Sequence, residues 1–85
     1  MQKKIVTFPI IIKKDKESAD YPYFVKIPDL DGMTEGKSIS DTIKMGKDYI
    51  QTYSLENELP ESNTHLPRTD KDKIAKLVTV NIYWL

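Results

Sequence analysis

Apolar and polar residues alternate with a period of two in three segments of the chain, and this period predicts β-strands. The apolar positions are the even ones in residues 5–12, the odd ones in residues 21–27, and again the even ones in residues 77–85. Each segment therefore has one apolar face that a core must cover. Pro9 lies within the first segment, and because proline lacks an amide hydrogen it marks a bulge, an edge or a gap between paired segments.

A turn and a very short strand follow the second of these segments. Pro28 ends the strand, and two aspartates flank Leu30 immediately before Gly32. This composition is typical of a turn whose glycine adopts a positive φ angle. Residues 33–35 leave room only for a brief third strand before Gly36.

The next segment has helical periodicity. Ser38 and Asp41 fit the N-cap and N3 positions of a capping box, which predicts a helix over residues 39–53. Its buried stripe consists of Ile39, Ile43, Gly46, Ile50 and Tyr53. Glycine at position 46 costs about 1 kcal/mol of helix propensity relative to alanine. We therefore expect the helix backbone to approach the sheet closely there.

The order of these elements predicts an α+β fold of the type β-β-β-α-β. Residues 55–73 contain Pro60 and Pro67 and form a long connection, with a short turn of helix around residues 69–74. Hairpins make the first three strands antiparallel in turn. If the helix and the connection together form one crossover, the last strand lies parallel to the first. The expected product is a four-stranded mixed sheet of order 3-2-1-4, with the main helix on one face.

One helix covers only one face of such a sheet. The expected helix-facing residues are Val6, Phe8, Ile10, Ile12, Tyr23, Val25, Ile27, Val78, Val80, Ile82 and Trp84. The opposite face carries Ile5, Ile11, Phe24, Leu77, Tyr83 and Leu85, which is more apolar surface than a small monomer usually exposes. A second copy of the chain, a different protein or a missing C-terminal segment would cover it. We expect a homo-oligomer, a dimer or higher, that self-associates through a sheet surface or a sheet edge.

Composition narrows the classes of function. The 85 residues form a single domain, and a net charge of zero disfavours direct nucleic-acid binding by residues 1–85. Cysteine is absent, which excludes disulfides and thiolate metal sites. The longest apolar run is too short to span a bilayer and no signal-peptide pattern is present, so a cytoplasmic location is the default expectation.

The residues of one stretch, in their order of appearance, resemble a known family. This stretch is Tyr23-Phe-Val-Lys-Ile-Pro-Asp-Leu-Asp-Gly32, followed by Thr34-Glu-Gly36, the helix headed by Ser38 and the strand from Leu77 to Tyr83. Together these segments resemble the HicB-like antitoxin domain, and the resemblance covers most of residues 1–85. It implies a partial RNase-H-like fold and the antitoxin role of a type II toxin-antitoxin pair.

The resemblance also implies a partner, a small HicA-like mRNA endonuclease toxin whose active site the antitoxin blocks. The family usually adds a C-terminal DNA-binding domain, whereas this sequence stops at Leu85. We therefore expect a truncated or proteolysed product, or a solitary short family member. The alternative function is a solitary regulatory or scaffolding module that self-associates, or docks on another domain, through its open sheet face.

The acidic turn is the candidate partner-binding site. Its residues are Asp29, Leu30, Asp31, Met33 and Glu35, an apolar and anionic set that suits a basic partner. The alternative interpretation is an ordinary structural turn, and the sequence leaves both open.

We predict no catalytic residue, metal or cofactor. An RNase-H-like fold raises the possibility of a nuclease that uses Asp29, Asp31, Glu35 and Asp41, but these acids cluster in one turn and one helix cap, where aspartate has structural roles. His65 is the only histidine and lies in the polar connection, without a nucleophile that it could activate.

Overall fold

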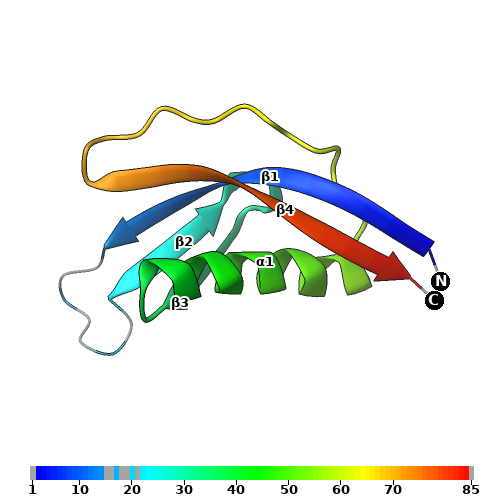
Figure 1. Ribbon diagram of the computed structural model, residues 1–85, viewed down its shortest axis with the longest axis horizontal. Helices are drawn as coiled ribbons and strands as arrows, with labels where there is room; N and C mark the ends of the chain where they lie inside the picture. Colours follow the sequence, from blue (N-terminus) through cyan, green and yellow to red (C-terminus); the bar gives the residue numbers. More distant parts are fainter. Residues whose placement is uncertain (1, 15–16, 18–19, 21, 85) are drawn as a thin grey trace.

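The computed structural model describes residues 2–14, 17, 20 and 22–84, without the side chains of residues 2, 83 and 84. The elements along the chain are β1 (Gln2–Lys14), β2 (Tyr23–Ile27), the 3₁₀ turn η1 (Pro28–Leu30), β3 (Gly32–Gly36), α1 (Ile39–Glu56) and β4 (Lys73–Trp84) (Figure 1). The predicted α+β class and the order β-β-β-α-β are confirmed. The helix extends three residues beyond the predicted Tyr53, and the first and last strands along the chain begin earlier than expected.

The four strands form one sheet of order β3-β2-β1-β4, as predicted. All three pairs are antiparallel, so the prediction of a mixed sheet is wrong. Gln2 pairs with Trp84 at one end of the β1·β4 ladder and Lys13 pairs with Lys73 at the other. The parallel β4 that a single crossover predicted is therefore absent.

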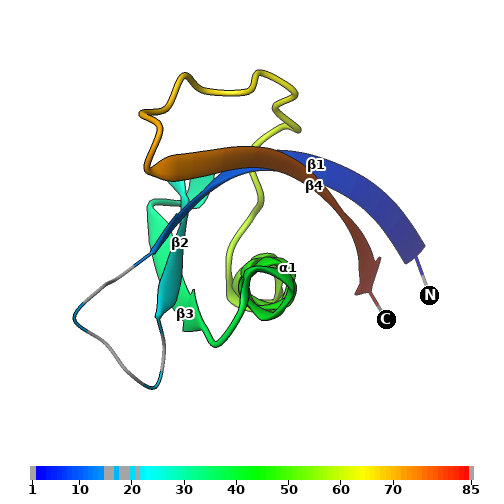
Figure 2. The ribbon, with the colours of Figure 1, turned by 60° about the vertical axis from the view of Figure 1, so that its left-hand side comes forward.

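The path of residues 57–72 explains the direction of β4. The helix already returns the chain toward the end where β3 began, and a strand starting there would run parallel to β1. Instead residues 57–72 begin on the helix side of the sheet, where Leu59 packs against the core, and then run back along the face opposite α1 before β4 begins (Figures 1 and 2). Extended chain covers about 3.3 Å per residue, so this segment can span the length of β4. The predicted single crossover is thus two passes, one over each face.

No helical turn forms near residues 69–74. The amide of Lys73 donates to the carbonyl of Asp70 (3.0 Å), which closes a turn directly before β4. Ile74 and Lys76 then continue the ladder opposite Ile12 and Ile10, so β4 begins four residues earlier than the predicted Leu77.

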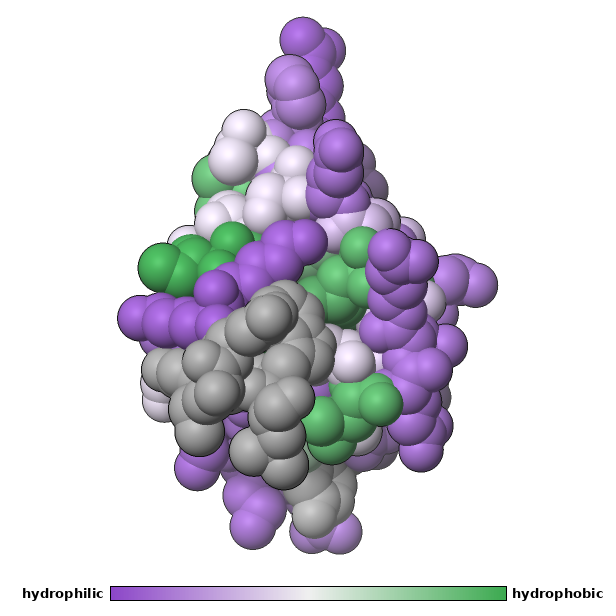
Figure 3. Space-filling model, turned by 90° about the vertical axis from the view of Figure 1, so that its right-hand side faces the viewer, coloured by the Kyte–Doolittle hydropathy of each residue, from purple (hydrophilic) through white to green (hydrophobic). Residues whose placement is uncertain are grey.

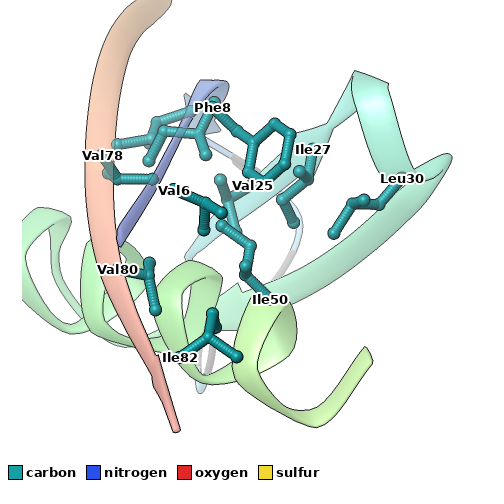
Figure 4. Packing of buried hydrophobic residues seen from close by; sticks show 11 residues of the cluster. Val6, Phe8, Val25, Ile27, Leu30, Ile50, Val78, Val80 and Ile82 are labelled. Carbon is teal, nitrogen blue, oxygen red and sulfur yellow. The ribbon is translucent and has the colours of Figure 1, made fainter. Parts of the chain in front are cut away.

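The core lies between the sheet and α1 (Figure 4). The sheet curls around the helix in the view of Figure 2. Of the predicted helix-facing residues, all those in β1, β2 and β4 with described side chains are buried, except Tyr23, which is partly buried against the same core. The side chain of Trp84 lies outside the described part. Ile50 of α1 is fully buried among these strand residues, as its helical position predicts.

The start of α1 follows its sequence signal. Ser38 is the N-cap and its Oγ accepts a hydrogen bond from the Asp41 amide (3.0 Å). The carboxylate of Asp41 accepts from the amide of Lys37 (2.8 Å), one residue before the cap. Thr42 is fully buried, and its hydroxyl donates to the Ser38 carbonyl (2.6 Å). These bonds join the first turn of the helix to the end of β3.

Pro9 occupies a gap between two paired segments, one of the three alternatives that its sequence position left open. The amide and carbonyl of Thr7 bond Ser62 (3.0 Å) and Asn63 (2.9 Å) on the edge of β1 that faces away from β4. Alternation along a strand directs the amide position of Pro9 to that same edge. Pairing with β2 begins only at Ile11, so no ladder partner is lost at Pro9.

Gly46 generates a stability prediction. It is buried, and a β-carbon there would lie 3.8 Å from the Val25 methyl groups and 3.9 Å from Ile10 Cδ1, which is ordinary van der Waals contact. We expect Gly46→Ala to raise the free energy of unfolding by about 1 kcal/mol through better helix propensity. Gly46→Leu should lower it by about 1–3 kcal/mol through over-packing. Urea unfolding of both variants measures this, and a stabilised leucine variant would contradict the placement of Gly46 against the sheet.

Candidate protein-binding surface at the edge of β3

The turn between β2 and β3 buries one of the predicted recognition residues. Leu30 is only 6% exposed and belongs to the hydrophobic core, where it points toward Ile27 and Ile50 (Figure 4). It therefore contributes no contact surface, contrary to the prediction. The 3₁₀ turn places it there: the amide of Asp31 donates to the carbonyl of Pro28 (3.1 Å) and so directs the intervening Leu30 inward.

The expectation of a positive φ angle at Gly32 is also wrong. Asp31 takes the left-handed conformation (φ 50°), which aspartate tolerates better than most residues. Glycine is favoured at position 32 for a different reason, because a β-carbon there would overlap the ring of Tyr49 unless that ring moved. Gly36 is constrained in the same way by Thr42. Both glycines allow β3 to lie directly against α1.

Asp29 is engaged within the chain. Both of its carboxylate oxygens accept from Nδ2 of Asn63 (3.3 and 3.1 Å), while the backbone amide of Asn63 donates to Thr7. Asn63 therefore ties η1 and β1 together at the point where residues 57–72 pass between them. We interpret Asp29 as a structural residue, which is the alternative that the sequence left open.

The other three predicted residues remain on the surface. Met33 is 58% exposed, and Asp31 and Glu35 are exposed beside it. Met33 and Glu35 lie in β3, which is an edge strand. With Thr34 they line a shallow hollow of about 370 Å³ whose fourth lining residue is Met45 of α1. We call Asp31, Met33, Glu35 and Met45 the β3-edge surface.

Unpaired backbone groups complete this surface. Backbone amides and carbonyls of alternate residues point to opposite edges of a strand, and those of Thr7 point away from β4. Those of Ile11 and Lys13 therefore point toward β2, where they bond its even-numbered residues. Val25 and the other odd-numbered residues of β2 then bond β3. The residues of β3 that bond β2 are then Gly32, Thr34 and Gly36. The amides and carbonyls of Met33 and Glu35 point to the outer edge, where no described residue bonds them.

Met45 was missed by the sequence reading because it lies off the buried stripe of α1. Its side chain is 37% exposed and flanks the edge of β3 from the helix side. The signal that could have found it is its position three residues after Thr42 and four before Tyr49, the residues on which β3 rests. Methionine is flexible and polarisable, which suits a surface that adapts to a partner.

The open sheet face is partly covered by the chain itself. Residues 57–72 cross it, and Pro9 is buried there (Figure 2). Of the residues predicted on this face, Ile5 is 57% and Leu77 43% exposed, whereas Ile11 and Phe24 are half-buried. The side chain of Tyr83, and Leu85 as a whole, lie outside the described residues. Ile11 and Phe24 line a hollow of about 170 Å³ together with Lys13, Lys26 and Lys73.

Further hollows lie near the C-terminal end of α1. The larger, of about 340 Å³, lies between that end and β4 and is lined by four polar residues, Leu55 and Ile82. A view onto the end of the molecule where β1 begins and β4 ends shows hydrophobic atoms as separate patches among hydrophilic ones (Figure 3). No continuous apolar patch is visible on that view outside the grey atoms.

The acidic residues considered for nuclease chemistry do not converge. Within residues 2–14, 17, 20 and 22–84, no three His, Asp or Glu side chains are grouped so that they could hold a metal ion. Asp29 bonds Asn63 and Asp41 bonds the Lys37 amide. His65 is exposed, and its amide donates to Oδ1 of Asn63 (2.9 Å). Among the described helices, none is long and apolar enough to cross a membrane.

No family model, curated protein or solved structure matches this chain. The HicB-like resemblance therefore rests on the motif residues themselves.

The contact between Asp29 and Asn63 generates the second prediction. Asn63→Ala should lower the free energy of unfolding by about 1–3 kcal/mol, because it leaves a half-buried carboxylate without its side-chain partner. In a double-mutant cycle with Asp29→Ala, we expect a coupling free energy of about 0.5–1.5 kcal/mol. Chemical denaturation measures both quantities. Thr64→Ala, at the exposed neighbouring position, is the control, and additive effects of the two main substitutions would show that the contact does not stabilise the fold.

Proposed function

We propose that this chain is a non-enzymatic antitoxin that binds a small HicA-like mRNA endonuclease toxin and blocks its active site. The observation that carries the proposal is the β3-edge surface, which combines unpaired backbone groups, two exposed methionines and two exposed carboxylates. The resemblance of residues 23–38 to the HicB-like pattern supplies the identity of the partner. A small RNA-binding toxin is expected to be basic, which complements Asp31 and Glu35.

The arrangement suits binding by strand addition. An extended segment of the partner would bond the outward amides and carbonyls of Met33 and Glu35 as a fifth strand. Met33 and Met45 would contact its apolar side chains from the two sides of the edge, and Asp31 and Glu35 would attract its cations. Strand addition derives affinity from main-chain bonds and specificity from the side chains that flank them.

The toxin is the part of the proposal that depends on the resemblance alone. The antiparallel β4 departs from the expected mixed sheet, so the support from fold is limited to the order of the strands. The second candidate is the regulatory or scaffolding module that docks through its open sheet face. The exposure of Ile5 and Leu77 on that face favours it.

Co-expression with a neighbouring small gene encoding a basic protein tests the first candidate, with rescue of growth as the readout. We expect the double charge reversal Asp31→Lys, Glu35→Lys to weaken binding at least about tenfold, or about 1.4 kcal/mol. Titration calorimetry on the purified pair measures this loss. Glu56→Lys makes the same type of charge change at the far end of α1 and should leave binding unchanged.

Three other outcomes would decide against parts of this proposal. Unaltered affinity in the double variant, with wild-type thermal stability, would remove the β3 edge from the interface. Loss of binding in Ile5→Lys alone would instead place the partner on the open sheet face. Failure to rescue growth with any such gene would favour the solitary module.

A further inference from the structure

The outer edge of β4 is the longest unpaired strand edge in the described part of the molecule. β4 has 12 residues and pairs only with β1. Its residues Ala75, Leu77 and Thr79 lie opposite Ile11, Pro9 and Thr7, the β1 residues that direct their polar groups away from β4. In an antiparallel pair, residues opposite such positions direct their own amides and carbonyls outward as well. These groups of β4 therefore point away from the sheet.

Asn81 confirms this orientation and marks the end of the open segment. Its carbonyl accepts a hydrogen bond from Nε2 of Gln51 in α1 (3.2 Å), beyond the outer edge of the strand. No described residue bonds the outward groups of Ala75, Leu77 and Thr79. The open segment is thus residues 75–79, between the turn that precedes Lys73 and the bond from Gln51.

We propose that the open segment of β4 pairs antiparallel with the same segment of a second copy of this chain. In the register centred on Leu77, that residue faces its own copy and Ala75 faces Thr79, so every outward amide and carbonyl meets a partner. A two-fold axis satisfies both strands with one arrangement, as isologous interfaces require. The proposal does not depend on the toxin, because it uses the opposite edge of the sheet from β3.

Side chains at this edge favour a copy in that register. In the register centred on Leu77, Lys76 lies opposite Val78 of the copy. A register centred one residue earlier would set Lys76 against Lys76 of the copy. Like charges directly opposite each other destabilise a sheet, so the register centred on Leu77 is favoured. Leu77 is 43% exposed on the open face, and Ile74 is exposed on the helix side of the same strand. Pairing about Leu77 brings the two copies of this leucine into contact on the open face.

The short segment limits the strength of the dimer. A stable interface buries about 1,200–2,000 Å² in total and weak, transient contacts bury less, and a pair of five-residue strand edges is a small contact of the second kind. We therefore expect a reversible dimer whose mass depends on concentration. The resulting sheet has eight strands, with a β3 edge at each end.

Sedimentation equilibrium of the 85-residue chain tests the association. The average mass should rise with concentration from 9.9 kDa toward twice that value. Leu77→Lys sets two lysines against each other at the two-fold axis and should hold the protein at the monomer mass at every concentration. Ile5→Lys is the matched control, since Ile5 is similarly exposed on the same face but lies in β1. It should associate as the wild type does.

Amide hydrogen exchange tests the pairing itself. The amides of Ala75, Leu77 and Thr79 should become protected in concentrated solution but not in dilute solution, whereas those of Lys76 and Val78, which bond β1, should be protected in both. Ala75→Pro removes an outward amide without removing an internal bond, and it should abolish the change for Leu77 and Thr79. Circular dichroism verifies that each variant folds.

Each contrary result overturns the proposal. A monomer mass at all concentrations would show that β4 does not pair. A dimer that survives Leu77→Lys but is lost in Ile5→Lys would place the contact on the open sheet face. A dimer without concentration-dependent protection of Ala75, Leu77 and Thr79 would place it elsewhere on the molecule.

Discussion

The buried face of β1 is the constraint on which the other elements depend. Val6, Phe8, Ile10 and Ile12 are at most 1% exposed, and burial of four such side chains contributes about 6–12 kcal/mol, which is comparable to the whole stability of a typical domain. This face requires a cover along its whole length, and α1 with its flanking strands supplies it. Because β1 pairs with β4 on one edge and with β2 on the other, it joins the two sides of the sheet.

Beyond this core, the distribution of backbone hydrogen bonds determines which surfaces can bind a partner. From Thr7 onward, the β2 side of β1 is closed in two ways, by β2 itself and by the Thr7 contacts with Ser62 and Asn63. The outer edges of β3 and β4 have no such cover in the described chain. An uncovered strand edge is a template for pairing, and proteins that keep one long usually use it or block it. The two proposals assign different partners to these opposite edges.

Local patterns predicted what depends on neighbours in sequence. The period of two identified the buried faces of β1, β2 and β4, and the Ser38–Asp41 signal located the start of α1, because both depend on side chains a few residues apart. The predicted direction of β4 was wrong because this direction depends on where residues 57–72 cross the sheet. That path is held by Asn63 with Thr7 and Asp29, residues more than thirty positions away, and no local pattern reveals the contact. The predictions of an exposed Leu30 and of a positive φ angle at Gly32 failed for a related reason. The composition of a turn does not show which side chain enters the core, nor that the ring of Tyr49 lies against Gly32.

The direction of β4 also bears on function. In an antiparallel β1·β4 pair, the facing residues either both bond across the pair or both point outward, so Thr7 and its hydrogen bonds determine which residues of β4 are exposed at the edge. The segment that reverses β4 thus acts twice: it covers part of the open face, and it sets the outer edge of the sheet. Pairing at the outer edges of β3 and β4, as the two proposals require, would use backbone groups of the described chain that take no part in the core.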